Sequence, residues 1–121
     1  MNEFMTTTLY GINQCDTIKK AKKWLQSHDE AFTFHDFRKD GIDEAWLSRA
    51  EAELGWEQLL NKRGTTFRQL PDEQKSGLTR EKALELMLAQ PAMIKRPVLH
   101  HNQEFFLGFT DSQYSGIFYH E

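Results

Sequence analysis

The sequence predicts an α/β fold in which a helical segment interrupts a mixed four-stranded sheet. Residues 7–37 show a strand, helix, strand pattern, residues 43–90 are dominated by helical spacing, and residues 93–117 show a β-hairpin followed by a helix. A β–α–β unit favours a parallel pair of strands, whereas a hairpin is antiparallel, so the sheet is expected to be mixed. A chain of 121 residues suits one domain.

The first part of the chain begins with a β-rich strand at Thr7–Tyr10, which Gly11 ends. A helix is predicted from Asp16 to about Ser27, and a second strand over Ala31–Phe37, where apolar and polar residues alternate. The apolar positions of the helix are Ile18, Ala21, Trp24 and Leu25. Its lysines occupy the other face, which we expect to be a solvated surface.

The middle of the chain is predicted to be all helical. Asp43 is expected to cap a helix that Gly55 ends, and Thr79 to cap the clearest helix of the sequence, which ends at Gln90-Pro91. The stretch Thr65–Gly77 between them is polar and rich in turn residues. The apolar positions expected in the first of these helices are Ala45, Trp46, Leu47, Ala50 and Leu54.

The last part of the chain is predicted to form an antiparallel hairpin and a short helix. Met93–Leu99 and Glu104–Phe109 are the expected strands, and His100–Gln103 the polar turn between them. Asp111 opens the final helix.

Composition excludes several classes of protein. The net charge of −3 argues against a nucleic-acid binder, and no run of about 18 apolar residues exists that could cross a membrane. The N-terminus lacks a signal-peptide pattern, and a lone cysteine fits a reducing compartment, so the cytoplasm is the expected location. Residues 1–6 are expected to be a disordered extension of a single domain at residues 7–121.

Cys15, the only cysteine, lies where the first helix is expected to begin. Unpaired backbone N–H groups and the helix dipole favour a thiolate at such a position, so Cys15 is a candidate nucleophile. The adjacent Asp16 opposes this effect through its negative charge. A buried, inert cysteine is the alternative, and position alone leaves both open.

Two arginines are the other candidates for a site. Arg96 precedes Pro97, and the free-energy difference between the cis and trans forms of such an X–Pro bond is small. The guanidinium of an arginine suits bidentate recognition of a carboxylate or another oxyanion. Arg63 lies in a loop and carries the same chemistry. The five histidines and the single cysteine show no ligand spacing, so no metal site is expected.

Three motifs together resemble the ArsC/Spx/YffB family, most closely its YffB-like branch. They are Leu9–Ala21 around the cysteine, Leu59–Gly64, and Ile94–Leu99, in the family's order and spacing. The resemblance implies a thioredoxin-like fold with a helical insertion. It also implies that Cys15 is the nucleophile, that Arg63 and Arg96 face its thiol, and that the Arg96–Pro97 bond is cis.

The chain departs from the family pattern at two places. Arsenate reductases of this type carry a third arginine in the second hairpin strand, where this chain has Phe106–Phe109. Losing one oxyanion-binding cation should weaken arsenate binding, since each charge-assisted contact contributes about 1.5–3 kcal/mol. Spx-type regulators have a Cys-x-x-Cys pair, and Ile18 stands at the second cysteine position, which excludes an internal disulfide switch.

These observations predict a thiol-dependent reductase that works through a mixed disulfide on Cys15. With no second cysteine, an external thiol such as glutathione must act as co-substrate, and no bound cofactor is expected. Arg63 and Arg96 would hold an anionic group, and Asn13 and Thr17 would line the site. The expected partners are a small thiol, an oxidised or anionic substrate, and a thiol-redox protein. An Spx-like regulator that binds RNA polymerase and an arsenate reductase remain the alternatives.

Overall fold

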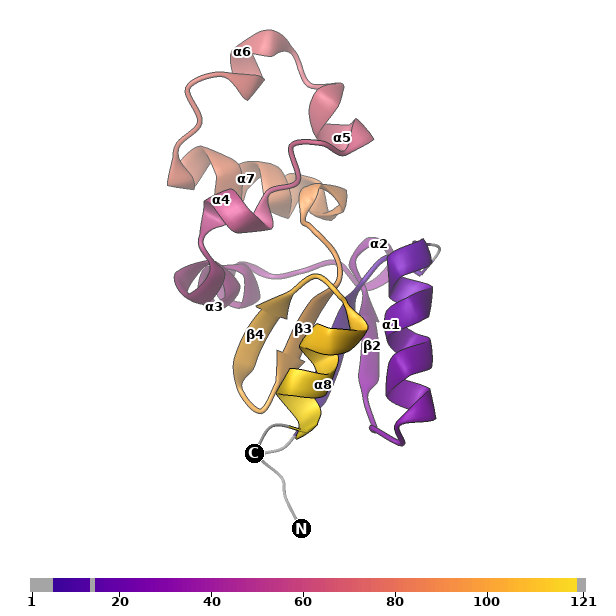
Figure 1. Cartoon of the computed structure of the whole chain (residues 1–121). Helices are drawn as coiled ribbons and strands as arrows, with labels where there is room; N and C mark the ends of the chain where they lie inside the picture. Colours follow the sequence, from indigo (N-terminus) through magenta and orange to yellow (C-terminus); the bar gives the residue numbers. More distant parts are fainter. Residues whose placement is uncertain (1–5, 14, 120–121) are drawn as a thin grey trace. The chain divides into compact units, whose positions relative to one another are not determined.

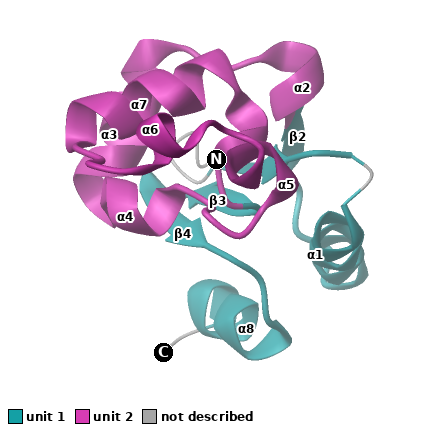
Figure 2. Cartoon of the chain, turned by 90° about the horizontal axis from the view of Figure 1, so that it is seen from above, with its two compact units in different colours: residues 1–35, 96–121 teal, residues 36–95 magenta. Residues whose placement is uncertain are grey.

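The computed structural model describes residues 6–13 and 15–119. Residues 1–5, on which most of the expected disordered extension falls, lie outside the described part. The described chain divides into two compact units, unit 1 (residues up to 35 and from 96) and unit 2 (residues 36–95), coloured separately in Figure 2. Unit 2 covers the segment for which the sequence predicts helices. Among the described residues, no helix combines the length and the apolar character needed to cross a membrane.

Unit 1 is a four-stranded sheet with strand order β2-β1-β3-β4 and two long helices (Figure 1). Its elements are β1 (Thr7–Gly11), α1 (Asp16–Ser27), β2 (Thr33–Asp36), β3 (Val98–His101), β4 (Glu104–Leu107) and α8 (Asp111–Tyr119). Strand β3 is antiparallel to both β1 and β4. The predicted α/β fold with a mixed four-stranded sheet is confirmed.

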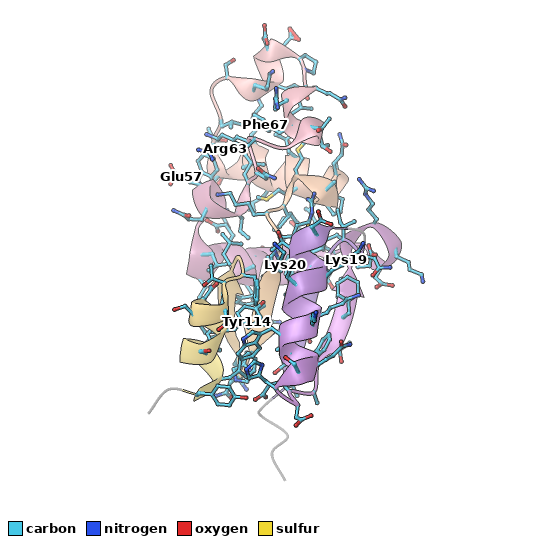
Figure 3. All side chains as sticks on the ribbon, turned by 45° about the vertical axis from the view of Figure 1, so that its right-hand side comes forward. Lys19, Lys20, Glu57, Arg63, Phe67 and Tyr114 are labelled. Atoms are coloured by element: carbon cyan, nitrogen blue, oxygen red, sulfur yellow. The ribbon has the colours of Figure 1, made fainter. Side chains whose placement is uncertain are left out.

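One face of this sheet carries the core of unit 1. Leu9 of β1 and Leu99 of β3 are paired across the sheet, and both are fully buried. They pack with Trp24 of α1 and Tyr114 of α8, so both helices cover the same face. Alternation along each strand produces this face, because successive side chains point to opposite sides of the sheet. Figure 3 shows Tyr114 between α8 and α1.

Unit 2 is helical. Its elements are α2 (Phe37–Asp40), α3 (Glu44–Leu54), α4 (Trp56–Leu59), α5 (Thr65–Arg68), α6 (Asp72–Lys75), α7 (Arg80–Ala89) and the 3₁₀ turn η1 (Pro91–Met93). The predicted caps are confirmed, since Asp43 accepts from the Trp46 N–H at 2.7 Å and Thr79 accepts from the Lys82 N–H at 3.2 Å. Ala45 is exposed, which corrects its placement on the buried stripe of α3.

The second strand ends earlier than the alternation predicts. Asp36 is the N-cap of α2, and its Oδ1 accepts from the N–H groups of Arg38 (2.8 Å) and Lys39 (3.2 Å). The side chain therefore competes with strand pairing by satisfying the first donors of a helical turn. Phe37 is buried in that turn instead of continuing β2. The polar stretch Thr65–Gly77 likewise contains the short helices α5 and α6 and not only turns.

The hairpin is displaced along the chain from its predicted position. Strand β3 starts at Val98, and Ile94 makes only an isolated bridge with Leu60. The turn consists of Asn102 and Gln103, both at positive φ (53° and 70°), while His100 and His101 belong to β3. A two-residue turn of this hand matches the twist of the flanking strands, and asparagine tolerates positive φ better than most residues.

Candidate functional site

Cys15 is the N-cap residue of α1 and is half-buried. Its backbone is extended, with φ −77° and ψ 132°, and its side chain makes no capping hydrogen bond. The Cys15 N–H donates to the Ile12 carbonyl at 3.0 Å, and its own carbonyl accepts from Lys19 N–H at 3.1 Å. The backbone therefore fixes the residue on both sides and leaves the thiol itself uncommitted to the helix.

Two polar residues predicted to line the site flank Cys15. Asn13 is exposed in the turn before it, where its Oδ1 accepts a hydrogen bond from Lys22 Nζ at 2.9 Å. Thr17 is half-buried in the first turn of α1. Asp16, between Cys15 and Thr17, is exposed and is the acidic residue of the first turn.

Arg96 lies at the end of β1, close to the turn that carries Cys15. Tyr10 of β1 pairs with Val98, so the next residue, Gly11, lies at the level of the Arg96-Pro97 segment. A Cβ added to Gly11 would lie 2.7 Å from Ile18 Cγ1 and 3.7 Å from Arg96 Cβ. The Arg96–Pro97 bond is cis, as the family resemblance implies, and Arg96 is half-buried with its Nε out of contact with solvent. The structure thus brings Arg96-Pro97 and the start of α1 to one end of the sheet.

Arg63 belongs to unit 2 and lies in the loop between α4 and α5. Its N–H donates to Asn61 Oδ1 at 3.1 Å, which closes the loop after α4. A Cβ on Gly64 would lie 3.0 Å from Asn61 Nδ2, so this loop packs tightly around the asparagine side chain. Arg63 itself is exposed and is labelled beside Glu57 in Figure 3.

Arg63 lines a hollow of about 340 Å³ that carries more positive than negative charge. Its lining residues are Glu57, Leu60, Asn61, Lys62, Arg63 and Lys95. The bridge between Leu60 and Ile94 brings the two chain segments together, with the Lys95 N–H donating to the Leu59 carbonyl at 2.8 Å. Lys62 and Lys95 were not among the predicted site residues. Their positions next to Arg63 and Arg96 in the two arginine motifs were the available signal.

The two departures from the family pattern have clear structural counterparts. Ile18, at the place of a second cysteine, is fully buried against Gly11. Where a third arginine would stand, Phe106 packs against the core of unit 1, Leu107 is half-buried, and Gly108 adopts φ 85°. The Gly108 N–H donates to the Pro97 carbonyl at 2.9 Å. This segment therefore supplies backbone and apolar contacts beside Pro97, and no cation.

The described residues contain no group of three or more His, Cys, Asp and Glu side chains placed to hold a metal ion. The structure describes all the predicted site residues: Arg63 lies in unit 2, and unit 1 contains Asn13, Cys15, Thr17, Arg96 and Pro97.

Comparison with models of protein families shows the family of this chain. The model of the ArsC family matches residues 10–117, which span the Cys15 motif and both arginine motifs. The chain belongs to the ArsC family.

Several relatives of this ArsC-family chain match nearly its whole length. A solved structure named YFFB (PA3664) protein is 51% identical, covers 92% of this chain and 97% of its own, and has a TM-score of 0.88. An arsenate reductase (ArsC) related protein from Brucella melitensis is 49% identical, with 95% and 96% covered and a TM-score of 0.76. An uncharacterized protein from Haemophilus influenzae is 41% identical over 111 residues, which are 92% of this chain and 97% of the relative.

A more distant relative is the global transcriptional regulator Spx of Streptococcus mutans, 26% identical over 108 residues, which cover 88% of this chain and 78% of the regulator. Together these similarities confirm the ArsC/Spx/YffB resemblance, and the solved structures share the fold of this chain.

Proposed function

We propose that this protein is a thiol-dependent reductase in which Cys15 is the nucleophile and glutathione is the external thiol. The observation that carries the proposal is the position of the only cysteine, which is the N-cap of a 12-residue helix and does not use its side chain as a cap. Backbone N–H groups at such a helix end stabilise negative charge on sulfur. Membership of a family that includes an arsenate reductase related protein supports an oxidoreductase.

The reaction needs one protein thiol and one external thiol. The Cys15 thiolate attacks the glutathione sulfur of a mixed disulfide R–S–S–G, forms a Cys15–S–S–G bond, and releases RS⁻, which takes up a proton. A second glutathione thiolate then attacks the glutathione sulfur of this adduct, releases the Cys15 thiolate, and leaves oxidised glutathione. Overall, R–S–S–G and one glutathione thiol become RSH and oxidised glutathione: the R sulfur gains one electron, and the sulfur of the second glutathione loses it together with its proton.

The cations near the predicted motifs suit the carboxylates of glutathione. A guanidinium binds a carboxylate bidentately, and we assign this role to Arg96 and Arg63, with Asn13 and Thr17 lining the sulfur. The hollow around Arg63 adds the ammonium groups of Lys62 and Lys95 against the single carboxylate of Glu57. This excess of positive charge supports an anionic ligand.

Mass spectrometry after exposure to oxidised glutathione tests the proposal directly. The wild-type protein is expected to gain one glutathione on Cys15, and reduced glutathione should remove it. Cys15→Ser is the matched control and should gain none. A wild-type protein that stays unmodified, or an adduct that reduced glutathione does not release, would overturn the proposal.

Steady-state kinetics with the mixed disulfide of glutathione and 2-mercaptoethanol test the arginines. Arg63→Gln and Arg96→Gln are each expected to raise the KM for the glutathione-containing substrate roughly 10- to 150-fold, because a charge-assisted contact contributes about 1.5–3 kcal/mol. Arg68→Gln, an exposed arginine of α5, should leave KM unchanged. If Arg63→Gln and Arg96→Gln keep the wild-type KM, as Arg68→Gln should, then Arg63 and Arg96 do not bind the carboxylates of glutathione.

An Spx-like role is the second candidate, because Spx of Streptococcus mutans is a relative. The fully buried Ile18 in place of a second cysteine counts against a redox-controlled regulator. Gel filtration of the purified chain with RNA polymerase separates the two candidates. Co-elution that Cys15→Ser does not alter, without any disulfide reduction, would favour the regulator.

A further inference from the structure

Lys22 differs from the other lysines of α1. Lys19, Lys20 and Lys23 are exposed, whereas Lys22 is half-buried. Its Nζ donates to Asn13 Oδ1 at 2.9 Å and lies 3.8 Å from the centroid of the Phe34 ring. The expectation that the whole lysine face of α1 is a solvated surface is therefore wrong at this position.

These two contacts hold the Lys22 ammonium at the end of α1 where Cys15 lies. Side chains on a helix lean toward its N-terminus, and Lys22 follows Cys15 by seven residues, about 10 Å along the helix axis. Its Nζ reaches back over this distance to Asn13, which precedes Cys15 in the turn. The Phe34 ring on β2 supports the ammonium from the side through a cation–π contact.

We infer that Lys22 is a positioning residue for Cys15, which clamps the turn before it and keeps a positive charge beside the sulfur. The inference rests on the proposed function, in which Cys15 carries negative charge both as attacking and as leaving group. The hydrogen bond from the Cys15 N–H to the Ile12 carbonyl closes the backbone of the turn. The hydrogen bond from Lys22 to Asn13 connects the exposed side chain of this turn to α1. Lys22 acts on the sulfur through this turn and through its charge, not by contact with the substrate.

The other charged groups of unit 1 near this turn differ from Lys22 in what they do. Asp16 is exposed and opposes a thiolate, while Lys19 is exposed and bonds Cys15 through its backbone only. Arg96 lies beside Gly11 at the end of β1. Lys22 donates from its side-chain ammonium to Asn13 of the turn itself.

The test measures the rate of Cys15 alkylation by iodoacetamide between pH 5 and pH 10 in the full chain. Lys22→Met is expected to slow alkylation at pH 6 roughly 3- to 10-fold, because a cation near the sulfur favours the reactive thiolate. The rate at pH 10 should change little, since the thiolate then forms without help. Lys22→Arg should restore most of the rate at pH 6, and Lys23→Met, an exposed lysine of the same helix, should behave as wild type.

Asn13→Ala separates the clamp from the charge, because it removes the acceptor and keeps the lysine. It is expected to slow alkylation at pH 6 less than Lys22→Met does. If Lys22→Met lowers the melting temperature but keeps the wild-type rate profile, the residue is only structural and the inference fails. If wild-type Cys15 already reacts as slowly as free glutathione at pH 6, the proposed function fails instead, so the two failures are distinguishable.

Discussion

Cys15 differs from the Asp and Thr residues that cap other helices of this chain, because its side chain makes no capping hydrogen bond. Asp36, Asp43 and Thr79 each accept a backbone N–H with a side-chain oxygen at the start of a helix, whereas the Cys15 side chain makes no such bond. Helix N-termini carry unsatisfied donors and a partial positive charge. The first turn of α1 therefore presents these donors where a sulfur anion would be stabilised.

Asp16 has opposite effects on the stability of α1 and on the reactivity of the Cys15 thiol. Its carboxylate stabilises the N-terminus of α1 and at the same time disfavours negative charge on the adjacent sulfur. Asp16→Asn is therefore expected to speed Cys15 alkylation at pH 6 and to lower the free energy of unfolding by about 0.3–1 kcal/mol. Iodoacetamide kinetics and urea unfolding measure the two effects. Asp111→Asn, in the first turn of α8, should reproduce the stability loss alone, and a slower reaction in Asp16→Asn would contradict the argument.

Tyr114 is buried without a partner for its hydroxyl among the described residues. Burial raises the pKa of Tyr114 above its ordinary value of 10.0. The native state therefore keeps the proton where the unfolded state loses it, so Tyr114 leaves the free energy of unfolding independent of pH below about pH 10 and makes it fall as the pH rises further. Tyr114→Phe is expected to raise the free energy of unfolding at pH 7 by about 1 kcal/mol, because it removes an unsatisfied buried donor.

Urea unfolding at pH 7, 9 and 11 measures this effect. The wild type should lose stability between pH 9 and pH 11 more steeply than Tyr114→Phe does. Identical slopes for the two proteins would show that the hydroxyl keeps a partner in solution.

The junction of β1 and α1 depends on a glycine. Ile18 occupies the space where a side chain at Gly11 would lie, and Ile18 is fully buried. Gly11→Ala is expected to cost about 1–3 kcal/mol, because the added methyl overpacks this contact. It should also slow Cys15 alkylation, since the turn follows Gly11 directly.

Gly116 supplies the matched control for Gly11. It lies in α8 with open space at its Cβ position, so Gly116→Ala should stabilise the protein by about 0.5–1 kcal/mol. Thermal unfolding of both variants measures the contrast. A neutral Gly11→Ala would mean that Ile18 repacks freely.

At the scale of elements, periodicity found the long helices and local side-chain chemistry decided their ends. The helix Asp16–Ser27 and the caps Asp43 and Thr79 were predictable because pattern and capping residue agree there. The strand before Phe37 was predicted too long because alternation does not reveal that Asp36 prefers to cap a turn. Polarity predicts His100 and His101 in the hairpin turn, whereas the turn forms at Asn102 and Gln103, which adopt positive φ.

The candidate site was predictable only in part for a different reason. Cys15 and the Arg96-Pro97 pair stand out as residue types with their own chemistry, and the family resemblance adds Arg63 to the expected site residues. Lys22 and Lys95 look like ordinary surface lysines in the sequence. Their contacts arise from a side chain that reaches back along its helix and from an isolated bridge between distant segments, neither of which periodicity encodes.

At the scale of the whole molecule, the number of arginines available to bind an oxyanion bears on the choice between the proposed disulfide reductase and an arsenate reductase. The family of arsenate reductases described above uses three arginines, and this chain places apolar residues from Phe106 to Phe109 at the third. Each missing charge-assisted contact costs about 1.5–3 kcal/mol of oxyanion binding, roughly 10- to 150-fold in affinity. Binding of glutathione needs no third arginine in this proposal, because Arg63 and Arg96 would each bind one of its two carboxylates.

We therefore expect the protein to reduce a glutathione mixed disulfide and not to oxidise glutathione when arsenate is added. Both activities are measured in one assay that couples oxidised glutathione to NADPH consumption through glutathione reductase, with Cys15→Ser as the blank. An ArsC-family arsenate reductase run alongside shows that arsenate turnover is detectable. Arsenate-dependent NADPH consumption that Cys15→Ser abolishes would show that two arginines suffice, and the missing third arginine would then no longer argue against arsenate as the substrate.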